Sequence, residues 1–155
     1  MRKNIVALVM LCTSVAALGM SAPAKAEMGK SYVGPVVFIG NGNTNVGVDS
    51  KFGVNENLSV RPFIQFPSGG TIFGASLTYD FPVTPSAKVQ ITPFVGGGVS
   101  VASSNSTNNS NTQAYFTGGA DFGISDSFDL KAELDVPLSS NNSSTNVRLA
   151  AGYKF

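Results

Sequence analysis

The end of this 155-residue chain alternates strictly between two kinds of side chain. The cations Arg148 and Lys154 share one parity, and the other parity is entirely apolar: Val147, Leu149, Ala151, Tyr153 and Phe155. Successive side chains of a β-strand point to opposite faces, so this pattern predicts a strand with one apolar and one polar face. The same alternation recurs upstream often enough to close a small barrel.

The start of the chain has the pattern of a secretory signal peptide. Arg2 and Lys3 form the positive segment, residues 5–18 the apolar segment, and Ala24-Lys25-Ala26 the cleavage site. The apolar segment is shorter than the roughly 20 residues of a membrane-spanning helix. We therefore predict that residues 1–26 are a signal peptide cleaved after Ala26, and that residues 27–155 form one barrel domain.

Eight strand-like segments follow, separated by clusters of Gly, Pro, Asn and Ser. They cover residues 32–39, 45–54, 58–66, 71–81, 88–102, 114–124, 128–136 and 146–155. Small bacterial barrels have an even number of strands, beginning with eight. The sequence therefore predicts an all-β fold: an eight-stranded antiparallel up-and-down transmembrane β-barrel.

The connections between these segments differ in length. Those after the second, fourth and sixth segments are short, whereas residues 103–112 and 138–145 form longer loops rich in Asn and Ser. Short periplasmic turns and longer extracellular loops are typical of outer-membrane barrels. We therefore expect both chain ends on the periplasmic side.

Aromatic residues on the apolar face gather at the strand ends. The set next to the short turns is Phe52, Tyr79, Phe81, Phe122, Phe128, Tyr153 and Phe155, and the opposite set is Phe66, Phe73 and Phe116. Two aromatic belts around an aliphatic band are typical of the two lipid–water interfaces. This sorting predicts that the apolar face points outward to lipid.

The charged residues of the strands all take the polar parity: Asp49, Lys51, Arg61, Asp80, Asp121, Asp129, Lys131, Glu133, Asp135, Arg148 and Lys154. An Arg or Lys on the lipid face at mid-bilayer would cost roughly 2 to 4 kcal/mol, which makes the segregation meaningful. The alternative is a soluble lipocalin-like carrier, in which the apolar face lines a ligand cavity. That fold would leave the sorted aromatic residues unexplained.

Three segments resemble the strands of a known family: Tyr32-Val33-Gly34-Pro35, residues 92–99 and residues 150–155. They are similar to the small eight-stranded outer-membrane barrels of the OmpA-like, OmpX-like and opacity-protein group, within the porin-like superfamily. The resemblance implies a location in the cell outer membrane, with membrane lipids as partners. It also implies that Tyr153 and Phe155 form the assembly signal read by the barrel-assembly machinery.

The polar face predicts a charge network in the lumen. The lumen of an eight-stranded barrel is filled by side chains, so buried charges there must pair. The turn at Asp126 places Asp121 opposite Lys131, and the loop near Asn141 and Asn142 places Asp135 opposite Arg148. Two further contacts follow from the parity: Arg61 reaches Asp49 diagonally, and Glu133 bridges Lys131 and Arg148.

Two prolines, Pro62 and Pro93, lie inside predicted strands. A closed barrel has no edge at which a missing N–H donor is harmless. We therefore expect local bulges at both positions, which would put the faces of Phe63 and Phe94 in question.

Composition narrows the function. The chain has no histidine, its one cysteine lies in the signal peptide, and no run of Lys or Arg is present. We predict no catalytic residue, cofactor, metal site or nucleic-acid partner, and a monomer. The protein is expected to be a structural or surface-type barrel; a narrow porin-like channel and an adhesin that binds through residues 103–112 remain alternatives.

Overall fold

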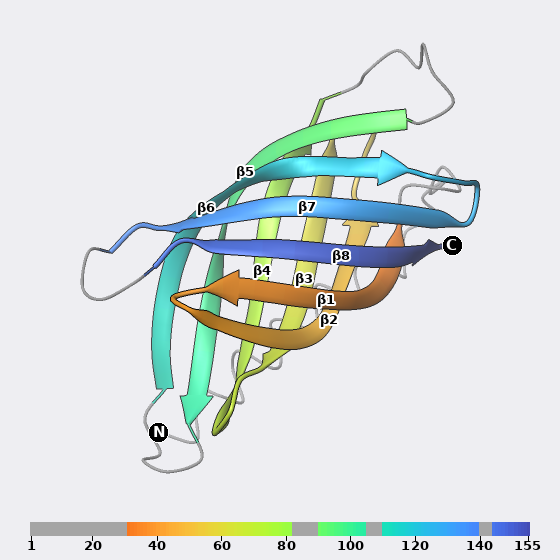
Figure 1. Cartoon of the computed structure of the whole chain (residues 1–155). Helices are drawn as coiled ribbons and strands as arrows, with labels where there is room; N and C mark the ends of the chain where they lie inside the picture. The colour runs from red at the N-terminus through yellow and green to blue at the C-terminus, as the bar shows by residue number, and fades with distance from the viewer. Residues whose placement is uncertain (1–30, 82–89, 105–109, 140–143) are drawn as a thin grey trace.

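The described part of the chain folds into one closed antiparallel barrel. The computed structural model describes residues 31–81, 90–104, 110–139 and 144–155. These residues form eight strands in sequential order, and the first pairs with the last (Figure 1). The strands are β1 (Tyr32–Gly40), β2 (Asn43–Gly53), β3 (Leu58–Phe66), β4 (Gly70–Asp80), β5 (Gln90–Ser104), β6 (Ser110–Gly123), β7 (Phe128–Pro137) and β8 (Asn146–Lys154). The predicted eight-stranded antiparallel up-and-down barrel is confirmed.

Two connections are tight, although they lie at the same end of the barrel as the longer loops. Asn41 and Gly42 join β1 to β2 with φ angles of 51° and 72°, the left-handed conformation that suits Asn-Gly in a two-residue hairpin. Residues 67–69 join β3 to β4, where Gly69 has a φ of 94°. The longer loops lie partly outside the described residues, which omit 105–109 and 140–143. Within the described residues, no helix is long and apolar enough to cross a membrane.

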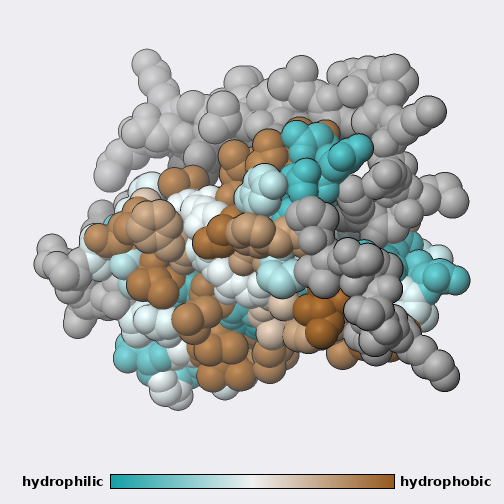
Figure 2. Space-filling model, turned by 90° about the horizontal axis from the view of Figure 1, so that it is seen from above, coloured by the Kyte–Doolittle hydropathy of each residue, from teal (hydrophilic) through white to brown (hydrophobic). Residues whose placement is uncertain are grey.

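The outer face of the barrel is apolar. Leu77, Val99, Leu134 and Leu149 are among the large hydrophobic side chains that face outward and are exposed. Figure 2 shows such side chains, in brown, spread over the surface seen from above. Near the short turns, Phe128 and Tyr153 pack edge to face with ring centres 5.5 Å apart, and similar pairs are Phe52 with Phe155 and Tyr79 with Phe81.

The prolines cause no bulge, so that prediction is wrong. β2 and β3 keep one register on both sides of Pro62, and β5 pairs with β6 without a skipped residue at Pro93. Ser50 faces Pro62 and donates its hydroxyl to the Pro62 carbonyl at 3.0 Å. The alternation is therefore unbroken, and Phe63 and Phe94 both point into the lumen, where they are buried.

Each of five lumen aromatic rings lies over a glycine of a neighbouring strand. The pairs are Phe38 with Gly47, Phe63 with Gly74, Tyr115 with Gly98, Phe94 with Gly119, and Tyr32 with Gly152. A Cβ at any of these glycines would lie 2.4 to 3.0 Å from the ring. The missing side chains thus make room for large rings in a lumen that is otherwise too narrow for them.

Candidate functional site: the charged lumen

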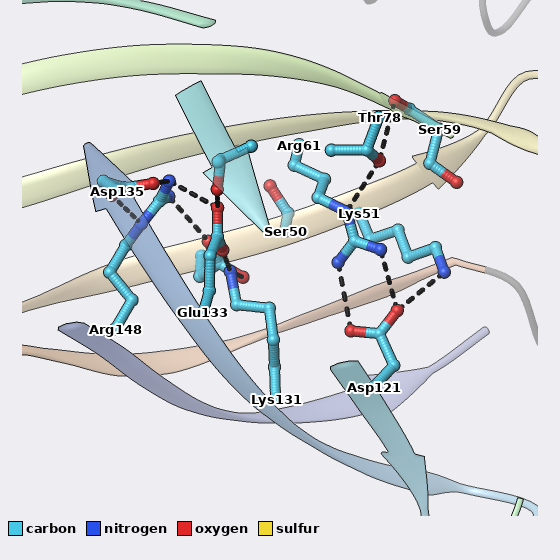
Figure 3. A network of polar contacts seen from close by, with 12 residues as sticks. Ser50, Lys51, Ser59, Arg61, Thr78, Asp121, Lys131, Glu133, Asp135 and Arg148 are labelled. Carbon is cyan, nitrogen blue, oxygen red and sulfur yellow. Dashed lines mark hydrogen bonds and ion pairs between the residues drawn. The ribbon is translucent and has the colours of Figure 1, made fainter. Parts of the chain in front are cut away.

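Charged side chains from six strands meet inside the barrel, in two groups that lie side by side (Figure 3). We name them by their arginines. The Arg61 cluster consists of Lys51, Arg61, Asp80 and Asp121, and the Arg148 cluster consists of Asp49, Lys131, Glu133, Asp135 and Arg148. All of these residues are buried.

The Arg61 cluster is a closed set of ion pairs. Lys51 Nζ lies 2.8 Å from carboxylate oxygens of both Asp80 and Asp121. Arg61 Nη2 contacts the same two carboxylates, at 3.0 Å and 2.8 Å. Two cations thus balance two anions, which is the condition for keeping charges in a low-dielectric interior.

Neutral groups hold this cluster in place. Ser59 donates its hydroxyl to Asp80 at 2.6 Å, and Arg61 Nε donates to the Thr78 hydroxyl at 2.9 Å. The Arg61 guanidinium also stacks on the ring of Phe94. The arginine is therefore held by groups from β4, β5 and β6.

The Arg148 cluster is not balanced. Arg148 contacts Glu133 at 2.5 Å and Asp135 at 2.6 Å, while Lys131 contacts Glu133 and, at 2.7 Å, Asp49. As defined on the described residues, the cluster has three carboxylates and two cations. Thr117 donates its hydroxyl to Glu133 at 2.5 Å, which adds a neutral partner on the carboxylate side.

The Tyr32 hydroxyl connects the two clusters. It donates to Asp49 Oδ2 at 3.2 Å and accepts from Arg61 Nη1 at 3.3 Å. At the short-turn end, Lys154 and Asp129 form a separate ion pair of 3.1 Å. The two clusters are thus joined through one tyrosine, and a further ion pair lies nearer the short-turn end of the barrel.

An aromatic layer lies against the Arg148 cluster. The ring centres of Phe38 and Phe63 are 5.4 Å apart, and those of Phe63 and Tyr115 are 6.5 Å apart. The Arg148 guanidinium carbon lies 4.5 Å from the centre of the Phe63 ring. Val36, Ile72 and Ala150 complete this layer. Rings and aliphatic side chains therefore fill the part of the described lumen that lies next to the Arg148 cluster.

The structure agrees with some of the predicted pairings. The register places Asp121 opposite Lys131, and Glu133 does bridge Lys131 and Arg148. The residue opposite Arg148 is Glu133 and not Asp135, so that prediction is wrong. Arg148 still contacts Asp135, which lies two residues beyond Glu133 on β7.

The predicted contact between Arg61 and Asp49 is also wrong. Arg61 turns across the lumen to Asp121, and Asp49 binds Lys131. Even Asp121 and Lys131, though opposite in register, take their ion-pair partners elsewhere. Neighbouring strands set the height of each charge, while the curvature of the closed barrel decides which charges meet.

Sequence reasoning missed several residues of this site. Lys51 and Asp80 are charged and had the correct parity, so the requirement that buried charges pair applied to them as well. Tyr32, Thr117 and Phe94 carried no such signal, because a neutral side chain on the polar face has many roles. Among the described residues, no group of three or more His, Cys, Asp or Glu side chains has the geometry to hold a metal ion.

The barrel resembles solved transmembrane barrels. No protein-family model matches the chain, and no curated protein matches it significantly. A de novo designed transmembrane β-barrel superimposes with a TM-score of 0.65 at 19% identity, covering 83% of this chain and 97% of the design. The chain has the fold of a small transmembrane β-barrel.

Two further barrels support this assignment. The N-terminal β-barrel domain of Pseudomonas aeruginosa OprF gives a TM-score of 0.57 at 15% identity, covering 83% of this chain and 99% of that domain. The designed protein TMB2.3 gives a TM-score of 0.60 at 15% identity, covering 83% of this chain and 95% of the design. At 15% identity, these two comparisons show that the chain shares its fold with small transmembrane barrels.

Proposed function

We propose that this protein is a non-enzymatic outer-membrane barrel of structural or surface type whose lumen is closed to ions. The single observation that carries the proposal is the occupied lumen: the Arg61 cluster, the Arg148 cluster and the aromatic layer succeed one another inside the barrel. A passing ion would have to displace buried, paired charges, each of which would then be left without its partner.

The outward apolar face and its aromatic belts support the membrane location. An exposed surface of this kind is unfavourable in water and favourable in a bilayer. The predicted signal peptide, cleaved after Ala26, provides the export that this location requires. The proposed assembly signal would consist of Tyr153 and Phe155, which contact Phe128 and Phe52 on the outer surface.

The location is tested by expressing the full chain in a Gram-negative bacterium and separating its membranes. We expect the protein in the outer-membrane fraction, with a mature N-terminus at Glu27 by mass spectrometry. We also expect its gel mobility in SDS to change on boiling, because a closed barrel resists SDS until it is heated. A soluble periplasmic protein without this change would contradict the proposal and favour the lipocalin-like alternative.

The closed lumen is tested by conductance in planar bilayers. We expect the wild-type protein to give no channel events, and the double variant Phe38→Ser, Phe63→Ser to give more, because it removes two rings of the aromatic layer. Insertion is checked for both proteins by the boiling-dependent shift after recovery from the membrane. Steady conductance of the inserted wild-type barrel would establish the narrow-channel alternative.

The adhesin hypothesis remains a prediction. Its loop, residues 103–112, includes residues 105–109, which lie outside the described part of the chain. Replacing residues 105–109 by a short Gly-Ser linker, in a barrel that still shows the boiling-dependent shift, would test it by cell-binding assays.

A further inference from the structure

The two-residue turn between β1 and β2 contains the one Asn-Gly pair of the sequence, Asn41-Gly42. Both residues are exposed. Their positive φ angles of 51° and 72° explain the choice of residues, because asparagine tolerates the left-handed conformation better than most side chains and glycine adopts it freely. The hairpin therefore selects a dipeptide that has a chemistry of its own.

That chemistry depends on the missing side chain of Gly42. The backbone nitrogen that follows an asparagine can attack the side-chain carbonyl carbon of that asparagine, and a Cβ on the following residue hinders the attack. No atom lies within 4 Å of a Cβ built at Gly42. Within the described part of the chain, no hydrogen bond holds the side-chain amide of Asn41 or the N–H of Gly42. Both reacting groups are therefore accessible.

Other described asparagines lack this combination. Asn55 Oδ1 accepts hydrogen bonds from the backbone N–H groups of Asn57 and Leu58, at 2.9 Å and 2.8 Å. Asn57 precedes a leucine and donates its side-chain amide to a backbone carbonyl of β4 at 3.2 Å. Asn43 and Asn45 precede threonine and valine, whose β-branched side chains crowd the backbone nitrogen. The structure thus singles out Asn41.

We propose that Asn41 is a site of spontaneous deamidation in the folded barrel. The Gly42 nitrogen gives up its proton and bonds to Cγ of Asn41, the bond from Cγ to Nδ2 breaks, and ammonia leaves with that proton. Water then opens the cyclic imide at one of its two carbonyl carbons, which gives aspartate or isoaspartate. One water is consumed and one ammonia is released, so the step requires no oxidant, reductant or cofactor.

The modification would give the loop end of the barrel a charge. No Asp, Glu, Lys or Arg is present in the described residues at this end, which are 40–45, 67–71, 103–104, 110–113 and 144–146. Either product adds a carboxylate there, and isoaspartate also lengthens the main chain of the turn between Asn41 and Gly42. The site does not depend on the membrane location or on whether the lumen conducts ions.

A tryptic digest separates the site from a matched control. Trypsin cleaves after Lys and Arg except before Pro, so Asn41 lies in peptide 31–51, and Asn55 and Asn57 lie in peptide 52–88. The full-chain protein is purified from membranes into detergent, kept folded at mildly alkaline pH, and sampled over time by mass spectrometry. We expect peptide 31–51 to gain the mass of one deamidation at Asn41 and to separate into aspartate and isoaspartate forms, while peptide 52–88 stays unchanged.

Two further samples make the result decisive. Asn41→Gly suits the turn and removes the amide, so we expect it to abolish the mass increase of peptide 31–51. An increase that persists in this variant would arise from Asn43 or Asn45 and would overturn the proposal. The proposal also fails if Asn41 stays intact in the folded barrel but reacts in the same protein unfolded in guanidinium chloride, because the hairpin would then protect the dipeptide.

Discussion

The guanidinium carbon of Arg61 lies 3.7 Å from the centre of the Phe94 ring, while the guanidinium nitrogens bind Asp80 and Asp121. The planar group is thus held at its edge by carboxylates and on its face by an aromatic ring. Arginine suits this position better than lysine, because only a guanidinium can do both at once.

Removing Arg61 should therefore be costly. We expect Arg61→Met to lower the free energy of unfolding by about 3 to 5 kcal/mol, since Asp80 and Asp121 would then share Lys51 alone. Urea unfolding of the barrel in lipid vesicles measures this loss. Lys154→Met, at a partly exposed ion pair with Asp129, is the control and should lose less. Equal losses would show that burial does not set the value of these pairs.

Two adjacent glycines of β5 should respond differently to alanine. A Cβ at Gly98 would lie 2.5 Å from the Ala75 carbonyl oxygen and 2.6 Å from the Tyr115 ring, whereas the nearest atom to a Cβ at Gly97 is 3.5 Å away. We expect Gly98→Ala to destabilise the barrel by about 1 to 3 kcal/mol and Gly97→Ala to have little effect. The temperature at which the folded band disappears from SDS gels compares the two, and a reversed order would contradict the inward position of Gly98.

The free-energy cost of a charge on the outer face should depend on its depth in the bilayer. Leu149 lies in the middle of β8 and Val54 lies beyond the end of β2, and both are exposed. We expect Leu149→Arg to cost roughly 2 to 4 kcal/mol and Val54→Arg at most about 1 kcal/mol in vesicles. If both substitutions were equally harmless, the outer face would not be in contact with lipid.

The turn between β1 and β2 offers a test of the backbone alone. Gly42 has a φ of 72°, and no atom lies within 4 Å of a Cβ built there. We expect Gly42→Ala to destabilise the barrel by about 1 to 2 kcal/mol through its left-handed conformation. Asn41→Gly should be tolerated in the same urea titration, because glycine adopts this conformation readily. A stable Gly42→Ala would mean that the turn changes its type.

The sequence predicts the strands and their faces well. Alternation is a local property, and it correctly placed Arg148 inward and Leu149 outward. The register of β6 with β7 also followed from the chain, since the turn at Asp126 is short and centred on one residue. The loop between β7 and β8 is rich in Asn and Ser and has no distinct centre, and the predicted pairing there was wrong by two residues.

Contacts across the lumen cannot be predicted from the alternation of side chains or from the length of the turns. Lys51 and Asp121 are 70 residues apart and meet only because the sheet closes on itself. Pro62 shows a different limit: the sequence signalled a missing donor, but the accommodation by Ser50 depends on the geometry of two paired strands.

The contacts between aromatic rings and glycines can form at different stages of folding. Phe38 with Gly47, Phe63 with Gly74, and Tyr115 with Gly98 each join two strands of one hairpin, so these contacts are available as soon as that hairpin exists. Tyr32 with Gly152 joins β1 to β8. That contact can form only when the first and last strands meet, and the same tyrosine then bridges Asp49 and Arg61. Tyr32 therefore forms its contacts in the lumen only when the barrel closes. Its ring packs where β1 meets β8, and its hydroxyl then connects the two charged clusters.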